Sequence, residues 1–229
     1  MPESPGYYAF LGATGILWVA TYVLIIKVSF RDRSYGMPLV ALCGNISWEF
    51  QYAFVHPYDA LQRWACVAWF LFNLVIMATA LRFGPSHFPV LPARRAFYPS
   101  FAAVLALAYL GIHLLARYLE HGAGVYTGFA QTFLMSGLFL SMLLSRRSLR
   151  GQSLAIAYTK MAGTLCASLA YYAFSAQYRG SLLLAYLCTA ILLADVAYVA
   201  AVHSLRRKEA KGIDLVSHSP LPQQAPQAR

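Results

Sequence analysis

Four ionisable side chains lie within long apolar stretches of the sequence, namely Glu49, His113, Lys160 and Asp195. An ionisable group in the hydrocarbon core of a bilayer costs at least about 2.5 kcal/mol, so such groups usually face an interior cavity and serve a function. The two acids are the most informative, because a carboxyl group removed from water favours its neutral, protonated form. Such an acid can protonate an alkene or an epoxide, and aromatic faces can stabilise the resulting carbocation.

The neighbours of the two acids follow helical spacing. Asn45, Glu49 and Tyr52 are spaced to form one stripe on a helix, and Tyr198 lies one turn after Asp195. At about 1.5 Å per residue, Glu49 and Asp195 lie roughly 18 Å and 12 Å from the ends of their helices that face the same side. We therefore expect both carboxyl groups to face one cavity, where the second acid tunes the first or removes the final proton.

Other roles for these polar residues stay open at this point. The two acids could serve only as hydrogen-bonding groups between helices. Lys160 is a candidate partner for one of them, and neither Lys160 nor His113 is favoured as a catalyst on its own. Spacing alone does not decide between a catalytic and a structural pair.

The composition predicts a polytopic membrane protein. Hydrophobic residues make up 59% of the 229 residues, charged residues only 11%, and the mean hydropathy is +0.54, whereas a soluble domain is about one-quarter charged. A membrane helix needs about 20 apolar residues. Seven stretches qualify, at about 7–26, 37–55, 64–81, 100–116, 125–144, 154–174 and 181–203. We expect an all-α bundle of seven transmembrane helices over residues 1–203, with the first helix retained and not cleaved as a signal peptide.

The formal charge of +10 follows this topology. Fourteen of the eighteen basic residues fall in the segments on one side of the predicted spans, including the polar tail 204–229, which we expect to be disordered. The positive-inside rule then places the N-terminus outside and the C-terminus in the cytoplasm of a cell membrane. This distribution argues against nucleic-acid binding.

Metal and redox sites are not expected. The four cysteines (Cys43, Cys66, Cys166 and Cys188) lie inside predicted spans without a metal-binding or redox spacing, so we interpret them as packing residues. The histidines show no paired ligand spacing. The sequence also lacks an aspartate-rich magnesium motif, which argues against a reaction that begins with release of diphosphate.

Two segments carry a family resemblance. YGMPLVALCGNISWEFQYAFVHP (35–57), followed by LLADVAYV (192–199) in the last span, resembles the small integral-membrane terpene cyclases of fungal meroterpenoid and indole-diterpene pathways. It is also similar to their bacterial relatives in indole-sesquiterpene pathways of the drimentine type. The resemblance extends over nearly the whole chain, and N-x-x-W-E is its most specific part.

The resemblance implies an activity and a set of site residues. It makes Glu49 and Asp195 the catalytic acids of an isomerase-type terpene cyclase that needs no cofactor, and it makes Asn45, Trp48, Tyr52 and Tyr198 substrate-binding candidates. The substrate would be a prenylated molecule supplied by a prenyltransferase or an epoxidase. Compact loops and the polar tail favour a bacterial cytoplasmic membrane and a farnesylated indole or diketopiperazine.

Three other classes compete with the cyclase. A small proton- or cation-coupled transporter or channel also uses intramembrane acids. A retinal protein would need a Schiff-base lysine in the last span, whereas Lys160 lies one span earlier. A purely structural membrane protein is the third class.

Overall fold

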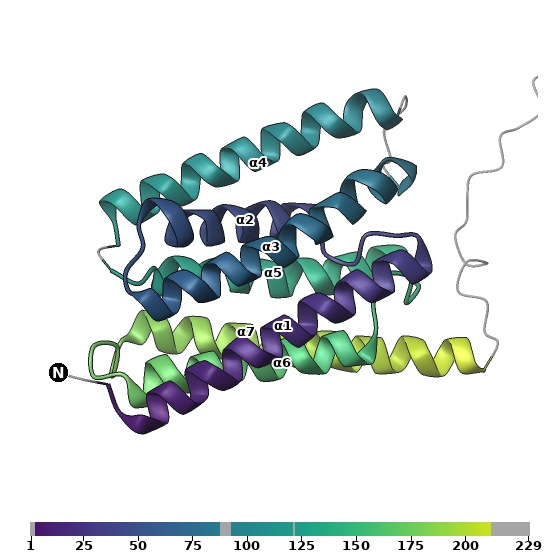
Figure 1. Ribbon diagram of the computed structural model, residues 1–229. Coiled ribbons are helices and arrows are strands. Elements are labelled where there is room, and N and C mark those ends of the chain that lie inside the picture. Colours follow the sequence, from purple (N-terminus) through teal and green to yellow (C-terminus); the bar gives the residue numbers. More distant parts are fainter. Residues whose placement is uncertain (1–2, 88–92, 121, 212–229) are drawn as a thin grey trace, which may run out of the picture.

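Each of the seven apolar stretches folds into an α-helix in the computed structural model, which describes residues 3–87, 93–120 and 122–211. Figure 1 shows these helices lined up as a bundle, and the described residues contain no strand. The helices are α1 (Pro5–Asp32), α2 (Leu39–Phe50), α3 (Ala60–Phe83), α4 (Ala93–Tyr118), α5 (Val125–Arg146), α6 (Leu154–Ser168) and α7 (Leu182–Ala210). The predicted all-α, seven-helix architecture is confirmed.

Five of the helices in the described part of the chain are long and apolar enough to cross a membrane by themselves: α1, α3, α4, α5 and α7. The two shorter helices, α2 and α6, each continue into a π-helical segment, Gln51–Val55 after α2 and Leu169–Phe174 after α6. Because successive helices alternate in direction, both π-helical segments lie at the same end of the bundle. Wide turns of this kind occur frequently at functional sites.

Helix α2 lies at the centre of the bundle (Figure 1), where it packs against α3, α4 and α5. Helix α1 packs against α3 and α6, while α7 packs against α5 and α6. Most residues of α2 are buried, including the polar Asn45, Ser47 and Glu49. A helix that is buried on nearly all sides can carry polar groups only if neighbouring helices supply hydrogen-bond partners. The fold therefore surrounds the one helix that carries Glu49.

Side chains before several helices satisfy the free backbone N–H groups of the first turn. In each case the capping oxygen accepts a hydrogen bond from the N–H three residues further on, and the capping residues are Ser4, Asp59, Ser153 and Ser181. Helix α5 follows Gly124 and is capped differently, because the Glu120 carboxylate accepts from the N–H groups of Tyr126 and Thr127. Such caps fix where each helix begins.

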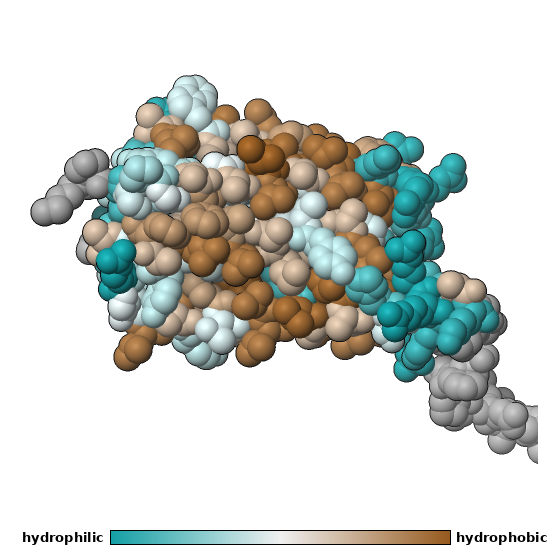
Figure 2. All heavy atoms as spheres, turned by 90° about the horizontal axis from the view of Figure 1, so that it is seen from below, coloured by the Kyte–Doolittle hydropathy of each residue, from teal (hydrophilic) through white to brown (hydrophobic). Residues whose placement is uncertain are grey.

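The hydrophilic side chains gather at one end of the bundle, while the surface over its middle is mainly apolar (Figure 2). At this end the Arg150 guanidinium donates to the Asp32 carbonyl at 2.9 Å, and Arg146 donates to the Tyr35 carbonyl at 3.0 Å. The Leu149 N–H donates to Glu209 at the end of α7. The loop before α2, the loop before α6 and the end of α7 therefore form one basic face, as the charge distribution predicted.

The last helix is longer than the sequence suggested. Helix α7 continues to Ala210, so the first residues of the segment 204–229 are helical and the prediction of disorder is wrong for them. The remainder of that predicted tail, residues 212–229, lies outside the described residues.

The basic face generates a prediction about topology. A reporter fused after Arg229 is expected in the cytoplasm, and one fused before Tyr7 is expected outside, because basic loops are retained on the cytoplasmic side. Protease protection of the two fusions in intact cells measures both positions. If both ends were found on the same side of the membrane, the number of spanning helices would have to be even.

Candidate active site

A cavity of about 340 Å³ lies between α1, α2, α3, α5 and α6. It extends from the end of the bundle opposite the basic face inward to Glu49 on α2. Aromatic rings form much of its wall: Tyr7, Tyr8, Trp18, Tyr22, Trp48, Tyr58, Trp69, Phe129 and Tyr171. A cavity with apolar, aromatic walls and a single deeply buried acid is suited to a largely apolar ligand.

The Glu49 carboxyl group is 1% exposed and is held by side chains from three helices. The Tyr22 hydroxyl of α1 donates to Oε1 at 3.0 Å. Asn45, one turn earlier on α2, donates to Oε1 at 3.2 Å and to the Tyr22 hydroxyl at 2.6 Å. Asn73 of α3 donates to Oε1 at 2.8 Å and to Oε2 at 2.9 Å. The predicted contact between Asn45 and Glu49 is confirmed.

The side chains around Glu49 are themselves held in place. Gln131 of α5 donates to the Asn45 Oδ1 at 3.1 Å, which brings a fourth helix into the network. The Asn73 amide nitrogen also lies 3.3 Å from the Trp69 carbonyl, so this amide is oriented with its N–H₂ group toward the carboxyl. Tyr22, Asn45 and Asn73 thus donate directly to the acid, and Gln131 supports Asn45.

Trp48 lines the cavity, whereas Tyr52 lies behind it. The Trp48 indole donates to the Thr127 Oγ1 at 3.2 Å, and the Tyr52 hydroxyl shares a hydrogen bond with the same oxygen at 3.3 Å. The Tyr52 ring fills the space beside Gly124, whose φ of 67° and missing side chain leave room for it. Tyr52 therefore supports the wall at Trp48 and does not itself line the cavity in the described part of the chain.

Asp195 forms a second polar centre with Lys160. Its Oδ1 lies 2.5 Å from the Lys160 Nζ, and both side chains are almost completely buried. The same ammonium group donates to the Ser136 hydroxyl at 2.6 Å and lies 5.8 Å from the centre of the Phe139 ring. This ion pair joins α6 to α7 and, through Ser136, to α5. The prediction that Lys160 pairs with one of the acids is confirmed.

The two acids do not share one cavity as the helix depths suggested. Asp195 and Tyr198 are absent from the cavity wall formed by the described residues. Tyr198 is fully buried, and its ring lies 5.6 Å from that of Phe139. The expectation failed because depth along a helix does not fix the direction of a side chain, and Lys160 provides a nearer partner for Asp195.

His113 lies apart from the cavity wall. Its Nδ1 is 3.3 Å from the Gln51 Oε1, and its ring stacks against that of His56 at 5.6 Å. These residues lie where the π-helical segment after α2 meets α4. His113 is absent from the wall of the cavity within the described residues.

Sequence reasoning missed two donors to Glu49. These donors are Tyr22 of α1 and Asn73 of α3. Both lie within predicted spans, where a hydroxyl or amide group needs a hydrogen-bond partner. Their polarity inside the membrane was therefore the available signal, although it could not identify Glu49 as the partner.

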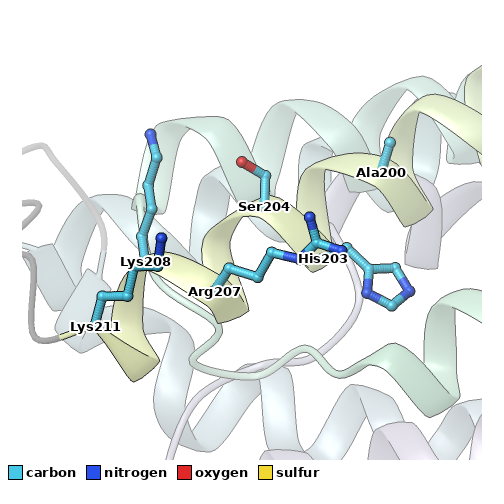
Figure 3. A pocket seen from close by; sticks show the side chains of 6 residues that line it. All are labelled: Ala200, His203, Ser204, Arg207, Lys208 and Lys211. Atoms are coloured by element: carbon cyan, nitrogen blue, oxygen red, sulfur yellow. The ribbon is translucent and has the colours of Figure 1, made fainter.

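A second hollow, of about 490 Å³, lies on the outer surface of α7 (Figure 3). Its lining residues come from this one helix and the residue that follows it: Ala200, His203, Ser204, Arg207, Lys208 and Lys211. It is open and basic, so it offers no enclosure for an apolar ligand. The aromatic cavity around Glu49 is therefore the candidate active site.

Comparison with known proteins identifies the family of the chain. The sequence profile of the Pyr4-like transmembrane terpene cyclases matches residues 7–208. The Pyr4-family terpene cyclase mfmH of Annulohypoxylon moriforme is 28% identical over 223 residues, which cover 91% of this chain and 92% of mfmH. Asnovolin H synthase nvfL of Aspergillus novofumigatus is 31% identical over 203 residues, which cover 85% of this chain and 84% of nvfL. Terpene cyclase pyr4 of Aspergillus fumigatus is 32% identical over 155 residues, which cover 66% of this chain and 64% of pyr4.

No solved structure matches the chain. The matched segment nevertheless contains Glu49, its hydrogen-bond donors and the Lys160–Asp195 pair. The names of these relatives favour an enzyme over the transporter, retinal protein and structural alternatives. The family resemblance noted in the sequence is thereby confirmed, and the chain belongs to the Pyr4-like transmembrane terpene cyclases, an enzyme of the terpene cyclase type embedded in a membrane.

Proposed function

We propose that this enzyme protonates the terminal alkene or epoxide of a prenylated substrate and thereby starts a carbocationic cyclisation, with Glu49 as the proton donor. The observation that carries the proposal is that Glu49 is a buried acid in the wall of an aromatic cavity. The proposed substrate is a farnesylated indole or diketopiperazine. The reaction needs no oxidant or reductant, because substrate and product are isomers.

The proton balance follows from the contacts of Glu49. Donation breaks the carboxyl O–H bond and forms a C–H bond at an alkene or an O–H bond at an epoxide. The carboxylate that remains accepts hydrogen bonds from Tyr22, Asn45 and Asn73. Hydrogen bonds to a charged acceptor are stronger than those to a neutral one, so these donors favour the state after proton transfer. A proton lost from the final cation can then restore the acid.

The aromatic wall of the cavity is suited to stabilising a carbocationic intermediate. Ring closure passes positive charge along the prenyl chain, and the electron-rich faces of aromatic rings attract such charge. Trp18, Trp48 and Trp69 all line the cavity that contains Glu49. We therefore propose Trp48 and Asn45 as substrate-contacting residues, and Tyr52 as a support behind Trp48.

Asp195 acts in this proposal through Lys160. The ion pair holds α6 against α7, and α6 carries Thr164 one turn after Lys160, where it forms part of the cavity wall. The Thr164 hydroxyl donates to the Lys160 carbonyl at 3.0 Å. Asp195 is thus a positioning residue. The Tyr198 ring packs against the ring of Phe139, which also lies near the Lys160 ammonium group.

The cellular setting is also a proposal. A prenyltransferase, with an epoxidase where an epoxide is used, must supply the substrate, because protonation and cyclisation neither attach a prenyl chain nor add an oxygen atom. The relatives named above come from fungi. The compact loops of this chain favour a bacterial cytoplasmic membrane.

The first test concerns the transferable proton. Glu49→Gln keeps the size of the side chain but removes its acidic proton, and general acid catalysis contributes about 10²–10⁴-fold in rate. Cyclisation of farnesylated indole, with and without a terminal epoxide, is therefore expected to fall by that factor in isolated membranes. Glu49→Asp retains an acid and should keep more activity than Glu49→Gln. Wild-type turnover by Glu49→Gln would rule out Glu49 as the donor.

A second test addresses the donors around the acid. Asn73→Leu removes both hydrogen bonds from α3 to the carboxyl, and hydrogen bonds to charged groups contribute about 1.5–3 kcal/mol each. We expect kcat to fall roughly tenfold or more, with a near-normal amount of folded protein. Ser47→Ala is the matched control, because this buried hydroxyl donates only to the Cys43 carbonyl of its own helix. Equal activity of the two variants would contradict the role of Asn73.

A third test separates support from chemistry at Asp195. Asp195→Asn leaves the buried Lys160 ammonium without a counter-charge, which should destabilise the fold by about 3–5 kcal/mol. The double variant Lys160→Met, Asp195→Leu removes both charges and should recover folded protein, as measured by thermal unfolding in detergent. If the double variant folds and cyclises substrate, Asp195 is a positioning residue. A folded but inactive double variant would instead show that the Lys160–Asp195 pair is required for the reaction and not only for folding.

A further inference from the structure

Residues of α1 and of the first turns of α3 both line the cavity. They are Gly12 and Gly15 of α1, and Leu61 and Ala65 of α3. Gly12 is exposed, and Leu61 is 57% exposed. Exposed lining residues on two neighbouring helices indicate that the cavity reaches the outer surface between α1 and α3.

These two glycines do not bring helices together. A Cβ atom at Gly163 of α6 would lie 3.2 Å from Leu17 and Trp18, so that glycine permits close packing of α6 against α1. At Gly12 and Gly15, in contrast, an added Cβ would meet no heavy atom within 4 Å in the described part of the chain. The missing side chains leave free space, and this space is continuous with the cavity.

The opening lies at the depth of the hydrocarbon region. Gly12 is seven residues beyond the first residue of α1, or about 10 Å along the helix. Large apolar side chains are exposed nearby on both helices, with Ile16 74% exposed on α1 and Trp64 67% exposed on α3. We expect an opening at this depth, beside such side chains, to contact lipid chains. Polar side chains, Asp59 and Gln62, occur at the end of the cavity furthest from Glu49.

We propose that the gap between α1 and α3 at Gly12 and Gly15 is a lateral opening that admits the prenyl chain of the substrate directly from the bilayer. This inference rests on the proposed function, because it takes the ligand to be a prenylated molecule. The prenyl chain passes Gly12 and Gly15 with its terminal alkene or epoxide directed toward Glu49. The polar head group of the substrate remains near Asp59 and Gln62.

Filling the opening tests this proposal. Gly15→Phe places a large ring in the free space, and kcat/KM for farnesylated indole is expected to fall roughly tenfold or more. Gly111→Phe is the matched control, since Gly111 of α4 also has no atom within 4 Å of an added Cβ among the described residues but lies outside the cavity wall. The amount of folded protein is measured for both variants. Equal activity of Gly15→Phe and Gly111→Phe would overturn the lateral opening.

A binding measurement separates this proposal from the proposed function. In membranes, a lipid-soluble thiol reagent should label Gly15→Cys and Gly111→Cys, and farnesylated indole should slow labelling of Gly15→Cys alone, by roughly tenfold when it saturates the site. Protection without cyclisation by the wild-type enzyme would support the opening and contradict the proposed reaction. Cyclisation without protection of Gly15→Cys would support the reaction and overturn the opening.

Discussion

A carboxyl group inside a lipid-embedded bundle must find its hydrogen-bond partners within the protein, because no water is available there to supply them. Glu49 imposes this requirement on the helices around α2. Tyr22 reaches it from α1, Asn73 reaches it from α3, and Gln131 of α5 orients Asn45 beside it. The positions of these helices are therefore tied to one acid, and the same helices form most of the cavity wall. Without the acid, the buried polar groups of Tyr22, Asn45 and Asn73 would lose the group to which they all donate.

The two buried acids differ in what surrounds them. Neutral donors surround Glu49, so its contacts can persist while the group loses and regains a proton. Asp195 faces an ammonium group, so a change in its charge would break the pair with Lys160. The contacts of Glu49 are therefore compatible with proton exchange, whereas the ion pair of Asp195 is suited to linking α6 to α7. The link still affects the cavity, because α6 carries both Lys160 and part of the cavity wall.

Much of the fold could be predicted from the sequence, because lipid permits few backbone structures and helix length is set by the bilayer. The spacing of Asn45 and Glu49 also correctly predicted that their side chains are neighbours, because both residues lie on one helix. Contacts between different helices could not be predicted in this way. Tyr52 turns toward Gly124, and Asp195 turns toward Lys160, for reasons that lie on other helices. Residue spacing within one helix contains no information about either partner.

The proposed opening at Gly12 lies toward the end of the bundle opposite the basic face. With the predicted orientation, the opening faces the outer leaflet of the membrane. A substrate that is prenylated in the cytoplasm must then flip from the inner to the outer leaflet before it can bind. An uncharged indole head group crosses the hydrocarbon region readily, whereas an ionised head group is held back by the cost of losing its hydration. The orientation of the bundle would thus select neutral substrates before they contact the protein.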